Sequence, residues 1–172
     1  TCFQGQTVDS GFLISKEDYI KLSISNSINS TVLKPFMVGE DLIGTKNSLY
    51  KRYAIDLNNK DIFEIQQYKE LLKIVENTVL PIVKSLAEKQ EQDIKEGKTK
   101  SRDRINHYKK WWTYWRDRKP LMDKLQNSSK YIVCSRVTKR PIFEFISSKI
   151  APGDALNCFT FTDDYSFGIL SS

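Results

Sequence analysis

The sequence predicts an α+β fold, in which a long helical hairpin packs against a mostly antiparallel β-sheet. Runs rich in β-branched and aromatic residues are separated by turn formers, which is typical of antiparallel strands and hairpins. Apolar residues that recur every three or four positions between 61 and 119 indicate amphipathic helices. A chain of 172 residues with 40% hydrophobic content suffices for one sizeable core. We therefore expect a single domain over residues 1–172.

The first third of the chain predicts one helix and one strand. Ser15 is a helix N-cap with an acidic residue, Asp18, three positions later, so a short helix should follow it. Segment 32–44 is interrupted by proline and glycine, and we expect a packed loop with short extended pieces. Residues 50–57 alternate like a strand. Its inward side chains are expected to be Tyr53, Ile55 and Leu57.

Two helices are predicted in the middle of the chain. Asp61 and Glu64 form a second capping box, and the apolar positions of 65–86 follow at helical steps. Pro81 removes a backbone hydrogen bond, so this helix should kink or restart there. A polar connection, 88–98, then leads to segment 98–119, which we expect to be one helix. The two helices should form an antiparallel hairpin.

Segment 98–119 combines an apolar stripe with basic side chains. The stripe consists of Ile105, Tyr108, Trp112 and Trp115. We consider five of these basic residues to be candidate phosphate contacts, namely Arg102, Arg104, Lys109, Lys110 and Arg116. A net charge of +6 and a pI near 9.1 favour a polyanionic partner without establishing one. These side chains suit phosphate, and they equally suit a solvated face whose stems cover the tryptophans. Both interpretations stay open.

The last third predicts a hairpin with a basic tip. A short helical turn after Pro120 leads to strands at 130–137 and 142–146, and further strands are expected at 156–162 and 167–170. Arg, Lys, Asn, Thr and Asp side chains on a stiff hairpin or loop can reach base edges. The candidate base-reading residues are Arg136, Thr138, Lys139, Arg140, Asn157, Thr160, Thr162 and Asp163. The alternative is that they are ordinary tip and edge residues that discourage strand pairing.

No catalytic, metal or cofactor site is expected in this chain. Three scattered cysteines and the single His107 do not form a zinc motif, and they fit reduced thiols in a cytoplasmic protein. Glu96 and Lys98 have the spacing of some nucleases, but within a hydrophilic connection. The acidic neighbours Glu40 and Asp41 are expected to be solvated.

No apolar run is long enough for a membrane span. The ends of the chain suggest a piece of a longer protein.

Several short motifs occur in an order that resembles one known family. They are Phe3-Gln-Gly-Gln6, Gly11-Phe-Leu-Ile-Ser-Lys-Glu17, Leu33-Lys-Pro-Phe-Met-Val-Gly-Glu-Asp-Leu42, Arg52-Tyr-Ala-Ile-Asp56, Trp111-Trp112, Tyr131-Ile-Val-Cys-Ser-Arg-Val-Thr-Lys139 and Phe167-Gly-Ile-Leu-Ser-Ser172. Together they resemble the target-recognition region of MmeI-like (type IIG/IIL) adenine-specific DNA methyltransferases. These are single-chain restriction–modification enzymes, and related phage-defence methyltransferases share their build.

The resemblance implies that the chain reads double-stranded DNA for an S-adenosylmethionine-dependent N6-adenine methyltransferase. The methyltransferase catalytic domain of the same parent chain would be its partner, with or without a nuclease. The Asn/Asp-Pro-Pro-Tyr/Phe catalytic motif and the cofactor loop of that activity do not occur here. In the family, base readers lie on the hairpin at 136–140 and on the segment 157–164, whereas Trp111, Trp112 and Arg118 are architectural. The competing hypothesis is a protein-interaction or scaffolding domain of a defence complex.

Overall fold

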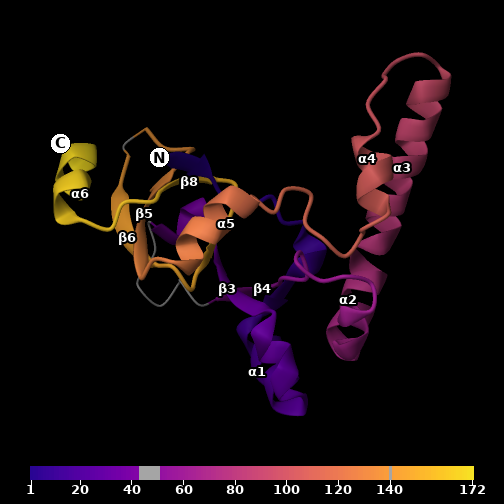
Figure 1. Ribbon diagram of the computed structural model, residues 1–172, viewed down its shortest axis with the longest axis horizontal. Coiled ribbons are helices and arrows are strands. Elements are labelled where there is room, and N and C mark those ends of the chain that lie inside the picture. The colour runs from indigo at the N-terminus through magenta and orange to yellow at the C-terminus, as the bar shows by residue number, and fades with distance from the viewer. Residues whose placement is uncertain (43–50, 140) are drawn as a thin grey trace.

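The computed structural model describes residues 1–42, 51–139 and 141–172 and has an α+β fold, as predicted (Figure 1). In this part of the chain the strands form two four-stranded sheets, ordered β1-β8-β5-β6 and β2-β4-β3-β7. Their pairing is antiparallel except between β3 and β7. The strands are β1 (Cys2–Gln4), β2 (Leu13–Ser15), β3 (Leu33–Met37), β4 (Arg52–Ile55), β5 (Lys130–Ser135), β6 (Phe143–Ser147), β7 (Ala151–Pro152) and β8 (Leu156–Phe159).

Helices connect and flank these sheets. The α-helices are α1 (Lys16–Ser25), α2 (Lys69–Thr78), α3 (Leu80–Lys95), α4 (Asp103–Tyr108), α5 (Lys119–Gln126) and α6 (Asp164–Ser171). Short 3-10 helices include η1 (Ser10–Phe12), η2 (Ser27–Thr31), η3 (Gly39–Leu42) and η5 (Glu64–Gln67). None of the described helices is long and apolar enough to cross a lipid bilayer.

Each sheet has its own buried cluster. The sheet β1-β8-β5-β6, called the hairpin sheet below, packs on α5 through Leu121 and Leu125. The other sheet packs on α2 and the start of α3, where Leu71, Val75 and Val83 are buried. Both clusters exclude water from large aliphatic side chains, which is the main favourable contribution to folding. The hairpin sheet is thus supported independently of the long helices.

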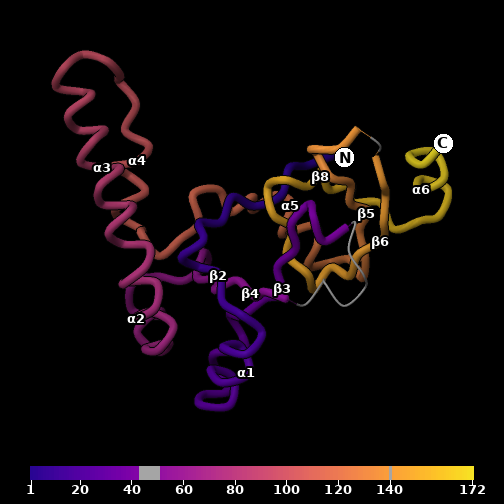
Figure 2. The backbone as a smooth tube through the Cα atoms, turned by 180° about the vertical axis from the view of Figure 1, so that it is seen from behind, coloured from indigo at the N-terminus to yellow at the C-terminus, as the bar shows by residue number. Residues whose placement is uncertain are grey.

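The helices α3 and α4 lie side by side and extend away from both sheets (Figure 1). We call residues 80–108 the helical arm. The view from behind shows the same arrangement, with the arm at one end of the longest axis and α6 at the other (Figure 2). The predicted helical hairpin is therefore present, joined to the core through α2 and the first turn of α3.

The predicted helix start at Ser15 is confirmed by its cap, whereas the α-helix expected after Asp61 begins only at Lys69. The backbone N–H of Asp18 donates to the Ser15 hydroxyl at 3.1 Å. Asp61 and Glu64 form a reciprocal capping box, with bonds of 2.8 Å in both directions, although the first turn after it is the 3-10 helix η5. The expected restart at Pro81 occurs between α2 and α3, with the proline in the first turn of α3, where its missing N–H costs no helical bond.

The prediction of one helix over 98–119 is wrong, because α4 ends at Tyr108. Beyond it, the Trp112 indole N–H donates to the Lys60 carbonyl at 3.1 Å, and the Tyr114 backbone N–H donates to Asn58 Oδ1 at 2.8 Å. The Tyr114 bond takes the place of a helical backbone bond, and the Trp112 bond ties the segment to residue 60. The chain then passes through a left-handed residue, Arg118 at φ 54°, before α5 begins. The apolar stripe is therefore divided between a short helix and an irregular segment.

Three further boundaries differ from the prediction. The polar run 88–98 is mostly helical, since α3 continues to Lys95. Within 32–44, of which Ile43 and Gly44 lie outside the described residues, β3 is a regular strand despite Pro35. Proline is tolerated because β7 pairs only with Phe36 and Met37, so one side of Pro35 is unpaired. Residues 167–170 belong to helix α6, because Asp163 caps that helix.

Candidate nucleic-acid interface

The predicted hairpin forms, and its first strand is buried. The strands β5 and β6 pair from Lys130 opposite Ser147 to Cys134 opposite Phe143. Residues 131–133 are fully buried, and the Tyr131 hydroxyl donates to the Ile150 carbonyl at 2.9 Å. Burial raises the pKa of Tyr131 well above its ordinary value, so it remains a neutral donor. A hairpin anchored in this way presents its tip from a fixed position.

The tip carries the exposed side chains Arg136, Thr138 and Lys139, and Arg140 lies outside the described residues. Arg136 is held twice, because its backbone N–H donates to the Ala155 carbonyl at 2.8 Å and its Nη1 donates to the Asp154 carbonyl at 2.9 Å. One edge of the guanidinium is thereby fixed. A fixed arginine is suited to the two-bond recognition of a guanine edge.

Gln4 was not among the predicted site residues, yet it links the tip to the interior. Its Nε2 donates to the Asp154 carbonyl at 3.2 Å, the same acceptor that holds Arg136. Its Oε1 accepts from Arg118 Nη2 at 2.7 Å. The Arg118 side chain is thus bonded within the protein, to the Gln4 amide oxygen and to the Gly5 carbonyl. The only sequence signal for Gln4 was its place in the first motif of the resemblance.

The second half of the base-reading set lies elsewhere. Along β8, Leu156 is opposite Ser135 and Phe159 is opposite Ile132, so this strand runs away from the tip. Residues 160–163 therefore follow the end of the sheet that lies opposite the tip. At ~3.3 Å per residue, this end is about 20 Å from the tip. Asn157 lies between these ends, half-buried and paired with Gln4. The structure does not bring the two halves of the predicted set together.

Thr160 and Thr162 stand between β8 and α6, and Asp163 is the N-cap of α6. The Asp163 carboxylate accepts from the Ser166 backbone N–H at 2.7 Å and from its hydroxyl at 2.9 Å. These bonds, with a smaller attraction from Lys130, lower the pKa of Asp163. This residue therefore has a structural task besides any contact with a base.

The five candidate phosphate contacts lie on the arm and on the segment after it. Arg102 immediately precedes α4, and the Arg104 guanidinium stacks on the Trp115 ring, 3.6 Å from its centroid. Lys109 and Lys110 are exposed just beyond α4. Arg116 is also exposed, and its carbonyl accepts from the Thr7 backbone N–H at 3.0 Å. Arg104 thus covers a tryptophan, as one interpretation held, while the lysines project into solvent.

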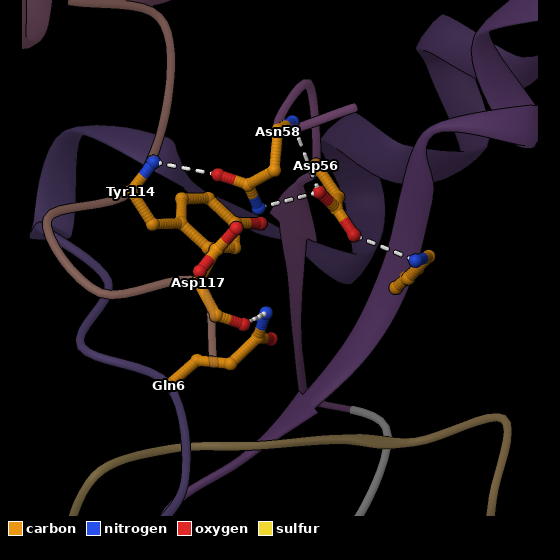
Figure 3. A network of polar contacts seen from close by, with 6 residues as sticks. Gln6, Asp56, Asn58, Tyr114 and Asp117 are labelled. Atoms are coloured by element: carbon orange, nitrogen blue, oxygen red, sulfur yellow. Dashed lines mark hydrogen bonds and ion pairs between the residues drawn. The ribbon is translucent and has the colours of Figure 1, made fainter. Parts of the chain in front are cut away.

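A polar joint fixes the segment that carries these basic residues (Figure 3). Asn58 Nδ2 donates to Asp56 Oδ1 at 2.6 Å, while Asn58 Oδ1 accepts the Tyr114 backbone N–H. Gln6 Nε2 donates to the Asp117 carbonyl at 2.7 Å. The joint therefore ties the N-terminal segment and the end of β4 to residues 114–117.

A cavity of about 20 Å³ adjoins this joint, lined by Gln6, Asp56 and Asp117 among others. Gln6 Oε1 and the Tyr114 hydroxyl are buried without a hydrogen-bond partner among the described residues. The cavity is large enough for one water molecule. Burial, with a smaller effect of the Asp56 charge, raises the pKa of Tyr114 well above its ordinary value. No group of three metal-binding side chains occurs in the described residues.

The arrangement of sheets, arm and hairpin occurs in a solved protein. The chain has the fold of part of a restriction–modification enzyme. That enzyme is the type IIL restriction–modification enzyme MmeI, solved in complex with DNA. The match has a TM-score of 0.66 at 16% sequence identity and covers 100% of this chain but 20% of the MmeI chain. No protein-family model and no curated protein sequence matches. The chain thus spans about a fifth of the solved enzyme, and the likeness is one of fold.

Proposed function

We propose that this chain is the DNA target-recognition domain of an S-adenosylmethionine-dependent N6-adenine methyltransferase of a restriction–modification or phage-defence system. The observation that carries the proposal is the fold match, which extends over the whole chain to a segment of an enzyme solved with DNA. The motifs of the sequence support the same family. The chain itself is non-catalytic in this proposal.

The hairpin tip supplies sequence readout in this proposal. Arg136 is fixed by its bonds to residues 154 and 155, and Thr138 and Lys139 project beside it from an anchored strand pair. Base contacts of this type discriminate by about 1–3 kcal/mol each when two hydrogen bonds form. Lys109, Lys110 and Arg116, with Arg102, contact phosphates and add affinity without sequence information.

The methyltransferase domain of the same parent chain holds S-adenosylmethionine and the catalytic residues in this proposal. The target adenine leaves the base stack to reach the methyl donor, at a cost of a few kcal/mol. Contacts to the duplex made by the recognition domain offset that cost. The enzyme acts on cellular DNA, so the proposal places it in the cytoplasm.

The test is a methylation map of genomic DNA from cells that express the full parent gene. Wild type is compared with Lys139→Gln and with the matched control Lys89→Gln, an exposed lysine on α3. We expect N6-methyladenine in one sequence motif, a motif changed at one position for Lys139→Gln, and no change for the control. Absence of motif-specific methylation by an expressed wild type would refute the proposal.

A scaffolding role is the second candidate, and exposed apolar residues at the start of the helical hairpin favour it. Phe63 is 82% exposed and Ile62 is 44% exposed. Large apolar groups that lie together on a surface often mark protein contacts. If scaffolding is the function, Phe63→Ser abolishes partner binding while the methylation motif stays unchanged. If recognition is the function, Phe63→Ser leaves both assembly and motif intact.

A further inference from the structure

The fold brings one acidic residue, Glu40, to the base of the hairpin tip. The 3-10 helix η3 packs against the end of β5, at Ser135. A Cβ atom at Gly39 would lie only 3.0 Å from the Ser135 hydroxyl and 3.5 Å from the Ala155 carbonyl oxygen. The glycine therefore allows an approach that a side chain would hinder. The following residue, Glu40, is placed beside the tip although it is remote in sequence.

The neighbouring acids Glu40 and Asp41 have separate roles, and the expectation that both are solvated is wrong for Asp41. Asp41 is buried, its Oδ2 accepts from the Val38 backbone N–H at 2.9 Å, and it lies 3.5 Å from the Arg52 guanidinium. It holds the turn. Glu40 is exposed and makes no hydrogen bond or ion pair with the described residues. The first acid fixes the backbone from which the second presents an exposed carboxylate.

Glu40 lines a hollow of about 440 Å³ at the base of the tip. Its other lining residues are Val38, Gly39, Ser135, Val137 and Ala155. Among the described residues the lining is mainly small or apolar, and Glu40 is the one charged residue in it. A carboxylate near a basic DNA-binding tip repels the phosphate backbone. Such a charge opposes general affinity, and it favours binding only where the DNA offers a donor to it.

We propose that Glu40 is a specificity-determining residue that accepts a hydrogen bond from the N4 amino group of a cytosine in the major groove. A carboxylate is an acceptor only, and cytosine N4 is the donor that Glu and Asp read. Adenine also offers an amino group, but its N7 acceptor would face the carboxylate and repel it. The exposed Val137 side chain lies on the same hollow and suits the apolar C5 edge of a pyrimidine. This inference rests on the proposed DNA-reading function.

The test is selection from a library of random duplexes by the full-length protein, followed by sequencing of the bound fraction. Wild type is compared with Glu40→Gln and with Glu91→Gln, an exposed acid on α3 that gives the same change of charge. We expect wild type and the control to select one motif that contains cytosine. Glu40→Gln should lose about tenfold of its preference for cytosine at one position and keep the rest of the motif.

The outcomes separate this inference from the function on which it rests. If wild type selects no motif, the proposed function is refuted. If wild type selects a motif that Glu40→Gln leaves unchanged, Glu40 is not a reader and the DNA-recognition function stands. Equal weakening for all sequences, with a lowered melting temperature, would make Glu40 structural and overturn the inference. Loss of the cytosine preference with unchanged binding to unrelated DNA supports the inference. Tighter binding to unrelated DNA supports it further, because a repulsive charge has been removed.

Discussion

The hairpin tip and the helical arm both present positive side chains, but they support them differently. The tip extends from β5, which pairs with β6 on one side and β8 on the other and has three consecutive fully buried residues, 131–133. The arm beyond Ala87 is held mainly by contacts between α3 and α4, such as Gln90 Oε1 accepting from the Arg104 backbone N–H at 2.8 Å. One region is anchored in a core, and the other is a two-helix projection.

This difference separates two tasks in DNA binding. Readout of a base edge needs a side chain held within about 0.5 Å of its productive position. A phosphate contact tolerates a long, mobile lysine, because attraction between charges falls off slowly with distance. The tip therefore suits specificity and the arm suits affinity. Substitutions at the tip should therefore change the preferred base, and substitutions on the arm should change the affinity for all sequences.

The largest effect is expected from Leu156→Ala. Leu156 is fully buried where β8 pairs with the tip end of β5, and its truncation should cost about 2–5 kcal/mol of unfolding free energy. The tip would lose its support, so selectivity should fall as well. Denaturant titration measures the loss, and Ile24→Ala, on an 80% exposed side chain, is the control expected within about 0.5 kcal/mol. A cost below about 1 kcal/mol for Leu156→Ala would contradict the anchored tip.

Arg136→Lys is expected to have the next largest effect. It keeps the charge but removes the planar fork that the Asp154 carbonyl holds, so discrimination at one base pair should fall by about 1–3 kcal/mol. Competition between matched and singly altered duplexes measures this discrimination. If binding to all duplexes weakens equally, Arg136 is a phosphate contact and the division between tip and arm is wrong at this residue.

Much of the architecture could be predicted where the signal is local. Caps at Ser15 and Asp61, and the proline at 81, act on neighbouring backbone groups, so the sequence around them is sufficient. The end of α4 could not be predicted in this way. It depends on bonds from Trp112 and Tyr114 to residues 60 and 58, which only the folded chain brings close.

The candidate site also has one part that local sequence signals predict and one part that depends on the folded chain. The hairpin and its basic tip follow from two β-rich runs and a polar connection, so Arg136, Thr138 and Lys139 could be proposed without a structure. Their separation from residues 160–163 depends on strand register, which no local pattern gives. The strand predicted over 167–170 is wrong, because its apolar content was given more weight than the helix cap. Asp163 and Ser166 already had the spacing of a cap for α6.

A smaller effect is expected from Lys109→Ala or Lys110→Ala. Either substitution should weaken binding about equally for all sequences and make the dependence of log K on log salt shallower by about one unit. Titrations at several salt concentrations measure the slope, and Lys84→Ala serves as control because Lys84 already pairs with Glu88 on α3. An unchanged slope for both lysines would place the segment just beyond the helical arm away from DNA.

The smallest change is expected from Asp163→Asn, which tests the far end of the hairpin sheet. The bonds from Ser166 lower the pKa of Asp163, so the charged cap stabilises α6 above the ordinary aspartate pKa of about 3.9. That contribution is lost as the pH falls through the lowered value. Asparagine still caps a helix but does not titrate, so the amide signal of Ser166 should lose its acid-dependent shift while α6 persists at neutral pH.

The same variant decides whether the far end reads DNA. A reader at Asp163 accepts a donor through its charged carboxylate, and an amide of the same shape presents a donor of its own, so the preferred base should change. A cap alone should leave the selected motif intact. An altered motif would therefore extend readout along the hairpin sheet to both ends. An unchanged motif, with the altered pH response of Ser166, would restrict readout to the tip and leave Asp163 to hold α6.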